Sequence, residues 1–171
     1  MTTRPGPKGS RLDSGILRIV RDEAGASHGR STTVDGVTCW VIAAETVCEQ
    51  VLQAFARRPG PHVPSLPRGA PLAVLVAGED RAAWNSYGGH GLYVINPGRA
   101  AFEERGHARL HPGDAFLMVN NHLAELLSLV EVHCELCKSR TAEAWMQLLT
   151  LRLLDKVLDR DSYVAAGVIV T

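Results

Sequence analysis

The sequence predicts an α+β domain in which helices are segregated from a system of antiparallel strands. Apolar runs of strand length follow one another at hairpin spacing between residues 70 and 121. Helical spacing is confined to two blocks, at 41–58 and 123–159. Short connections such as GEDR favour antiparallel pairing of the flanking strands, so we expect layers of helix and antiparallel sheet.

Length and composition indicate a single globular domain. The chain has 171 residues, of which 46% are hydrophobic and 21% charged, and Lys plus Arg equals Asp plus Glu at 18 each. A domain of this size buries a sufficient core without disulfide or metal cross-links. The charge balance argues against a nucleic-acid or membrane partner, because either would favour a basic surplus.

The N-terminal stretch MTTRPGPKGSRLDS lacks the apolar segment of a signal peptide and is rich in Pro, Gly, Ser and basic residues. We therefore predict a flexible tail over residues 1–14, a single domain over residues 15–171, and a cytoplasmic location.

The order of elements can be read along the chain. GILRIV and STTV are expected to be strands, VIAAETVCEQVLQAFARR a helix, and PGPHVPSLPRG its end. The central strands are followed by two predicted helices, LAELLSLVEV and TAEAWMQLLTLRLLDKVL, the second with Thr141 as N-cap and Glu143 in its first turn. YVAAGVIV is expected to be the last strand. A parallel nucleotide-binding sheet is disfavoured, since neither a phosphate-binding glycine loop with lysine nor a dinucleotide fingerprint is present.

Acidic residues lie at the expected strand ends. Asp22 and Glu23 follow the first strand, Asp35 follows the second, and Asp161 precedes the last. Side chains at strand ends can converge on one edge of a sheet, and oxygen-only clusters suit magnesium or manganese. Ordinary surface turns are the alternative explanation for the same residues.

The motifs occur in an order that resembles the type 2C metal-dependent protein phosphatases (PPM family). GILRIVRDEA is similar to the family's first strand with its phosphate-binding arginine and acidic pair, and TTVDGV to its strand with a metal-binding Asp-Gly. GAPLAVLVAGEDRAAWNSYGGHGLYVI has the shape of the family's central hairpin. GDAFLMVNNHLAELL and RDSYVAAGVIV are laid out like its last two signatures, so the likeness covers about residues 15–171.

The resemblance implies a fold, a site and a reaction. The fold would be an antiparallel β-sandwich with helices on its outer faces (α-β-β-α layers). Arg18 would hold phosphoryl oxygens, and one or two Mn²⁺ or Mg²⁺ ions would activate a water for attack on phosphorus. The metal ligands implied are Asp22, Glu23, Asp35, the Gly36 carbonyl, Asn121 and Asp161, with Asp35 also catalytic. The substrate would be a phosphoserine or phosphothreonine protein or a small phosphate ester.

Departures from the family pattern give a second functional hypothesis. Asn121-His122 replaces the family's second Asp-Gly, so a neutral amide stands where a carboxylate ligand is expected, and GGHG at 88–91 replaces its G-D-S-R segment. These changes weaken the second metal position most. The alternative is therefore a pseudophosphatase, in which the same fold serves as a binding or regulatory module for a protein partner.

Cysteine and histidine residues leave further alternatives open. Cys134 and Cys137 are expected one turn apart on a helix, packed as small apolar side chains, with zinc or redox roles as alternatives. His90 and His122 are expected to be solvated turn residues, or else neutral ligands that favour manganese, iron or zinc and support a different reaction. A cupin-like strand pair in HARLHPGDAFLMVNNH is disfavoured by the long helical stretch after it.

Overall fold

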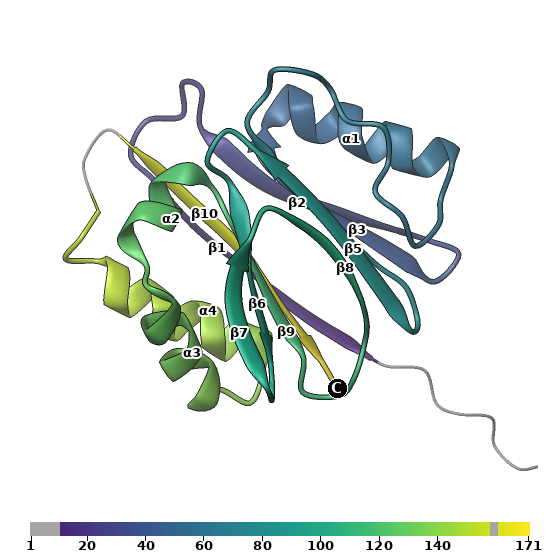
Figure 1. The fold of residues 1–171 in the computed structure, drawn as a ribbon. Helices are drawn as coiled ribbons and strands as arrows, with labels where there is room; N and C mark the ends of the chain where they lie inside the picture. Colours follow the sequence, from purple (N-terminus) through teal and green to yellow (C-terminus); the bar gives the residue numbers. More distant parts are fainter. Residues whose placement is uncertain (1–10, 158–160) are drawn as a thin grey trace, which may run out of the picture.

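The computed structural model describes residues 11–157 and 161–171, in ten strands and four helices (Figure 1). The strands are β1 (Leu12–Val20), β2 (Ser27–Val34), β3 (Val37–Ala44), β4 (Leu72–Ala77), β5 (Arg81–Tyr87), β6 (Gly91–Asn96), β7 (Arg99–Glu103), β8 (Arg105–Arg109), β9 (Ala115–Val119) and β10 (Ser162–Val170). The helices are α1 (Glu45–Arg57), α2 (Asn121–Leu126), α3 (Leu129–Cys137) and α4 (Ala142–Leu153). None of the described helices is long and apolar enough to cross a membrane.

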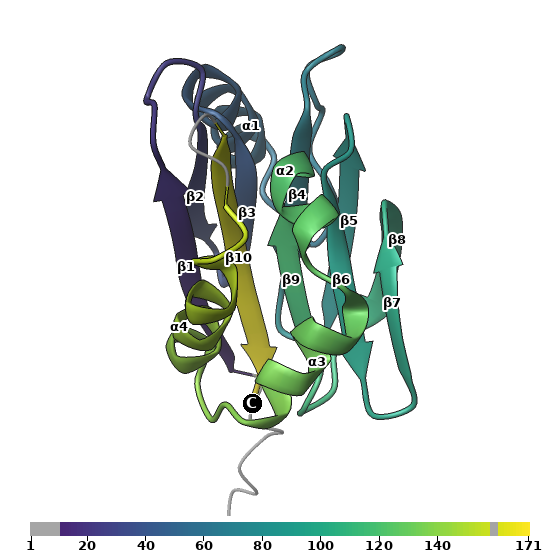
Figure 2. The same cartoon turned by 90° about the vertical axis from the view of Figure 1, so that its left-hand side faces the viewer.

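The strands form two five-stranded sheets in which every pairing is antiparallel. One sheet has the order β1-β10-β9-β6-β7 and the other β2-β3-β4-β5-β8. Figure 1 shows α2, α3 and α4 on one side of the two sheets and α1 on the other, and Figure 2 looks onto the face that carries α3 and α4. The predicted α+β sandwich with flanking helices is therefore confirmed.

Three apolar clusters hold the four layers together. The first joins the β1-containing sheet to α2, α3 and α4 around Trp145 and Leu149. The second fills the space between the sheets and includes Trp84 and Phe116, whose ring centroids are 5.5 Å apart. The third packs Phe55 and Val51 of α1 against the other sheet. Strands covered on both faces lose their polar–apolar alternation, which explains the continuous run LAVLVA of β4.

The helix expected from Val41 begins four residues later, at Glu45. Residues 37–44 are a buried central strand instead, paired with β2 on one side and β4 on the other. The run VTCWVIAA is apolar on both faces, so apolar residues also recur in it at helical spacing. Its β-branched residues favour the strand.

The boundaries differ from the prediction in two further places. β1 begins at Leu12, so residues 12–14 belong to the first strand and not to the tail; residues 1–10 lie outside the described part of the chain. LAELLSLVEV is two helices, because Ser128 starts α3 with a capping box in which its hydroxyl accepts from Glu131 N at 3.1 Å. Thr141 is the N-cap of α4 as predicted, accepting from Ala144 N at 3.1 Å. The helix ends at Leu153, before the predicted end, so its expected continuation over residues 154–157 is wrong; residues 158–160 lie outside the described part of the chain.

Two paired glycines let α4 approach the sheet closely. Gly15 of β1 lies opposite Gly167 of β10. A Cβ atom at Gly15 would lie 3.0 Å from the backbone carbon of Ala142, and one at Gly167 would lie 2.5 Å from the Met146 side chain. The Ala142 amide also donates to Asp13 Oδ2 at 2.8 Å, which fixes the first turn of α4 on β1.

Candidate functional site

Several chain segments meet at one end of the sandwich, at the upper left of Figure 1. The register pairs Val20 with Ser162 and Ser27 with Ala44, while the Ser27 amide donates to Ser162 Oγ at 3.1 Å. The end of β1, the start of β2, the β3–α1 junction, the β9–α2 junction and the start of β10 are thus brought together. We call this region the strand-end site; its charged and imidazole side chains include those of Arg18, Asp22, Glu23, His28, Arg30, Glu45, His122 and Asp161.

Arg18 binds the Glu23 carboxylate at two points. Nη2 is 2.9 Å from Oε2 and Nη1 is 3.2 Å from Oε1, while Nε donates to the Ser27 carbonyl at 3.2 Å. The hydrogen bond from the Arg18 guanidinium lowers the pKa of Glu23. Asp22, beside it, accepts from the Ala24 amide at 3.0 Å, so its carboxylate shapes the β1–β2 turn.

Glu45 opens α1 and forms a second set of ion pairs. Its Oε2 is 3.0 Å from Arg30 Nη2 and 3.1 Å from His28 Nδ1. A carboxylate in the first helical turn also suits the helix dipole. Arg18 Nη2 lies 3.4 Å from His28 Nε2, and Arg30 Nη2 lies 3.5 Å from His28 Nδ1. His28 thereby connects the Arg18–Glu23 pair to the Glu45–Arg30 pair.

Asn120 and Asp161 organise the other side of the site. Asn120 is completely buried; its Oδ1 accepts from the Val164 amide at 3.1 Å and its Nδ2 donates to the Ser162 carbonyl at 2.7 Å. It therefore fixes the end of β9 against the start of β10, and it is also the N-cap of α2. Asp161 Oδ2 is 3.5 Å from His122 Nδ1 and accepts from the Tyr163 hydroxyl at 3.4 Å.

His90 is buried beside this region. It exposes 3% of its surface, and its Nδ1 has no hydrogen-bond partner among the described residues. Burial lowers the pKa of His90 to about 4, and His122 acts in the same direction, while the Gly88 carbonyl acts in the opposite one. The expectation of a solvated turn histidine is wrong for His90.

The cysteines of HCELC also differ from their prediction. Cys134 and Cys137 lie one turn apart on α3 as expected, but both are exposed. Packing as buried apolar side chains is therefore wrong for them. Val132 and Leu136 pack α3 against the first apolar cluster, and the two cysteines lie on the other side of the helix.

Asp35 and Gly36 lie at the opposite end of the sandwich. They form the two-residue turn between β2 and β3, with Val34 paired to Val37 and positive φ angles of 52° and 77°. The eight residues of β2 separate this turn from the strand-end site, a span of about 26 Å at ~3.3 Å per residue. The expected convergence of Asp22, Glu23 and Asp35 is thus wrong, because Asp35 and the first two residues follow opposite ends of adjoining strands.

The strand that leads into α1 is β3, and it ends at Ala44. The position that the resemblance gives to a metal-binding Asp-Gly therefore corresponds to Ala44-Glu45 in this chain. Sequence reasoning missed Glu45 and His28; the acidic residue at a strand-to-helix junction was the available signal for Glu45, whereas only the β2–β3 pairing brings His28 to it.

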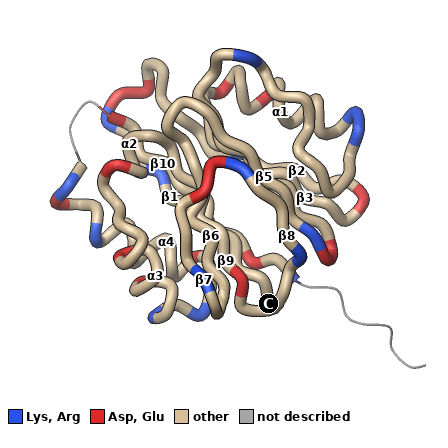
Figure 3. Tube along the Cα trace, in the orientation of Figure 1, with Lys and Arg blue, Asp and Glu red and all other residues tan. Residues whose placement is uncertain are grey.

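The donor groups at the strand-end site do not form a metal cage as they stand. Within residues 11–157 and 161–171, no three His, Cys, Asp or Glu side chains are placed to hold one ion. Figure 3 shows acidic and basic positions side by side at this end of the molecule. The carboxylates of Glu23, Glu45 and Asp161 contact cationic or imidazole groups, an arrangement that fits an ion-pair network better than a pair of divalent ions. The metal-ligand roles implied for Asp22, Glu23, Asn121 and Asp161 stay predictions.

Comparison with solved structures identifies the fold. A structure described as the PP2C phosphatase domain and a regulatory fragment of SpoIIE from Bacillus subtilis superposes with a TM-score of 0.70, at 9% identity over 95% of this chain and 63% of that one. RsbX in complex with magnesium gives a TM-score of 0.69, at 10% identity over 94% of this chain and 96% of that one. The chain has the phosphatase 2C fold.

A third structure with this fold is PppA, described as a key regulatory component of T6SS in Pseudomonas aeruginosa. It superposes with a TM-score of 0.65, at 18% identity over 95% of this chain and 99% of that one. No protein-family model and no curated protein sequence matches the chain. The likeness to the phosphatase 2C fold is therefore one of architecture, and the site residues carry the functional argument.

Proposed function

We propose that this chain uses the phosphatase 2C fold as a regulatory binding module for a phosphorylated protein, in the manner of a pseudophosphatase. One observation carries the proposal: the carboxylates of Glu23 and Glu45 at the strand-end site are held by arginines of the chain itself. The donor atoms of the site and the accessibility of Arg18 give it further support.

The charge arrangement supports binding over metal-dependent hydrolysis. In an oxygen-ligand site for Mg²⁺ or Mn²⁺, carboxylates face a common ion whose charge offsets their mutual repulsion. Here Arg18 offsets the charge of Glu23, and Arg30 that of Glu45. A divalent ion would have to displace two guanidinium groups in order to collect the same carboxylates.

The donor atoms at the two strand-to-helix junctions support the same conclusion. The β3–α1 junction presents Ala44, whose methyl group has no ligand atom, and the β9–α2 junction presents the neutral amide of Asn121. Both lie where the resemblance implies a carboxylate ligand. These two positions therefore carry no carboxylate, and the nearby Glu45 carboxylate is paired with Arg30, which lowers the affinity expected for a dication.

Arg18 is the group best suited to bind a phosphoryl oxygen. Its guanidinium is already arranged to hold two carboxylate oxygens, and phosphate presents the same two-point acceptor geometry. The Arg18 side chain is 29% exposed and Glu23 is 70% exposed, so an incoming phosphate can replace the Glu23 carboxylate without disturbing the core. A phosphoserine or phosphothreonine side chain on a partner protein is the ligand that we assign to it.

A metal-dependent phosphatase acting on phosphoserine, phosphothreonine or a small phosphate ester is the second candidate. Two observations favour it: Asp22 is exposed and contacts a backbone amide in place of a cation, and Asp161 is partly exposed beside His122. To bind one Mn²⁺ or Mg²⁺ ion, the Asp22 and Asp161 side chains would have to rearrange, and Asn121 would supply a further oxygen ligand.

Manganese calorimetry and phosphate-ester turnover in the same samples separate the two candidates. We expect no turnover above the blank and no saturable manganese binding by the wild type, together with binding of a phosphoserine peptide that Arg18→Gln removes. Manganese-dependent turnover that is lost in both Asp22→Asn and Asp161→Asn would instead establish the phosphatase. Unphosphorylated peptide of the same sequence is the control for charge-independent binding.

A further inference from the structure

A groove lies on the open side of the sandwich, where edge strand β7 of one sheet faces edge strand β8 of the other. Its volume is about 290 Å³, and its lining includes Trp84, Arg99, Glu103, Arg105 and His107. β1 of the strand-end site forms the other edge of the β7-containing sheet, with β10, β9 and β6 between the two edges. The groove is therefore separate from the strand-end site, and ligand binding in it does not require the phosphopeptide-binding role of Arg18.

The floor of the groove holds a buried donor without an acceptor. Trp84 exposes 3% of its surface, and no hydrogen-bond partner for its Nε1 exists among the described residues. A Cβ atom on Gly106 would lie 3.1 Å from Nε1 and 2.5 Å from Cζ2, so the polar edge of the indole faces β8 at the position that has no side chain. An indole N–H is a donor only, and a buried donor is stabilised by any acceptor that reaches it.

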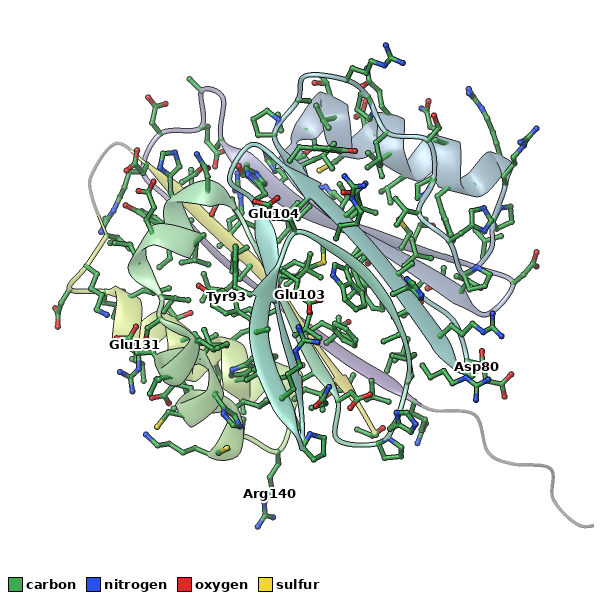
Figure 4. The ribbon with its side chains drawn as sticks, in the orientation of Figure 1. Asp80, Tyr93, Glu103, Glu104, Glu131 and Arg140 are labelled. Atoms are coloured by element: carbon green, nitrogen blue, oxygen red, sulfur yellow. The ribbon has the colours of Figure 1, made fainter. Side chains whose placement is uncertain are left out.

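The rim of the groove is positively charged. Arg99 Nη2 is 2.9 Å from Glu103 Oε1, so these two charges offset one another. Arg105 has no ion-pair partner within the described part of the chain, and His107 lies two residues further along β8. Figure 4 shows Glu103 on the side of β7 that faces β8, and Figure 3 shows acidic and basic positions adjoining where β7 passes into β8. The surplus charge at the rim is cationic.

From these observations we propose that the groove between β7 and β8 is a second binding site, specific for an oxyanion, in which Trp84 Nε1 donates to one oxygen and Arg105 to another. The ligand is a carboxylate or phosphate group, since both combine negative charge with oxygens that accept at two points. Neutral ligands would satisfy the indole and leave Arg105 without a counter-charge.

Such an oxyanion can come from a free small molecule or from the side chain of a partner peptide. A partner peptide could be held by β8, which is an edge strand of its sheet. An extended peptide can pair with such an edge while one of its acidic side chains enters the groove. Three probes distinguish the sources: inorganic phosphate, acetate, and an extended peptide that contains one glutamate.

The test follows the indole N–H signal of Trp84 by nitrogen-15 NMR, assigned by its absence in Trp84→Phe. Titration is carried out at constant ionic strength with chloride as the reference anion. We expect a saturable shift of the Trp84 signal with at least one probe, with the signals of Trp40 and Trp145 unchanged. Saturation by the free anions assigns a small-molecule site, whereas saturation by the peptide alone assigns a peptide side chain.

Two matched variants test the role of Arg105. Arg105→Gln should weaken binding about tenfold because it removes the charged two-point donor. Arg109→Gln removes the same charge from the same strand at a position that does not line the groove, and it should change affinity by less than about twofold. Equal effects of the two variants, or an unmoved Trp84 signal with all three probes, would overturn the proposal. Arg18→Gln should leave groove binding intact.

Discussion

Arg18 and Glu23 form a two-point ion pair across the β1–β2 connection, with Nη2 2.9 Å from Oε2 and Nη1 3.2 Å from Oε1. The pair occupies the position at which the resemblance expects a phosphate-binding arginine beside a metal ligand. Its geometry makes the Glu23 carboxylate a built-in competitor for any phosphate that approaches Arg18. Under the proposed function, the balance between this internal pair and an external phosphate sets the affinity of the strand-end site for its ligand.

Replacing Glu23 by glutamine should strengthen phosphopeptide binding. The variant removes the competing charge and leaves Arg18 in place, so the affinity for a phosphoserine peptide should rise by about three- to tenfold. Calorimetry with phosphorylated and unphosphorylated peptide measures the effect. A metal-ligand role for Glu23 predicts the reverse, namely weaker manganese-dependent binding, and Glu79→Gln at the opposite end of the molecule controls for net charge.

Replacing Asp35 should affect the β2–β3 turn and leave the strand-end site unchanged. Asp35 adopts a φ of 52°, which alanine tolerates poorly, so Asp35→Ala should lower the free energy of unfolding by about 1 kcal/mol. Asp35→Asn removes the carboxylate but keeps a side chain suited to this conformation, and it should be nearly neutral. Urea unfolding and phosphopeptide binding are measured for both; loss of binding in Asp35→Asn would contradict the assignment of Asp35 to a structural turn.

Gly15→Ala should displace α4 from the sheet. The added methyl group would lie 3.0–3.1 Å from the backbone of Ala142 and Glu143, which cannot yield as a flexible side chain does. We expect a loss of about 1–3 kcal/mol in the free energy of unfolding. Gly29→Ala, also in a strand, places its methyl group 3.5 Å from its nearest neighbours and serves as the control. Similar losses in the two variants would show that glycine is required for backbone reasons and not for the contact with α4.

Acid should weaken the contacts of α3 through Glu131. Hydrogen bonds from Lys156 and from the Ser128 amide lower the pKa of Glu131 to about 2 from 4.5 (the residue is labelled in Figure 4). Because the folded-state pKa is depressed, the stabilisation is present above pH 4.5 and is lost as the pH falls towards 2.

Glu131→Gln keeps a side chain that can complete the capping box and removes the charge. It should lower the Tm at pH 7 by a few degrees and leave it unchanged at pH 2. Thermal unfolding monitored by circular dichroism at both pH values checks this. Glu143→Gln, in the first turn of α4, is the matched control. A Tm difference that persists at pH 2 would show that the effect of the Glu131 side chain is not electrostatic.

His90 should make the fold sensitive to mild acid. Burial lowers its pKa to about 4 from 6.5, so the unfolded chain takes up a proton first as the pH falls. The free energy of unfolding is thus expected to decrease as the pH falls from 6.5 to about 4, because the folded state keeps the ring neutral throughout that window. His90→Leu should flatten this part of the profile in urea titrations, and His111→Leu, at an exposed turn, should not. An unchanged slope in His90→Leu would place the pH sensitivity elsewhere.

The sequence by itself determined the class of the fold and much of its order. Apolar runs bounded by GEDR and PG turns predicted the central antiparallel strands, and the Thr141 N-cap of α4 followed from residue type. Asp22, Glu23, Asn121 and Asp161 were placed at strand ends that do share one end of the sandwich. These features depend on local chemistry and spacing, which a single sequence contains.

Only the tertiary structure decided which strand ends meet. The apolar spacing of a run such as VTCWVIAA fits a helix as well as a doubly covered strand. Reading it as a helix assigned the metal-binding Asp-Gly position to Asp35-Gly36, one strand before Ala44-Glu45. The register of β2 against β3 then placed His28 against Glu45, and the facing of β7 and β8 placed Arg105 near the unpartnered indole of Trp84. These contacts join residues distant in the chain, so they depend on strand pairing and burial and leave no local pattern in the sequence.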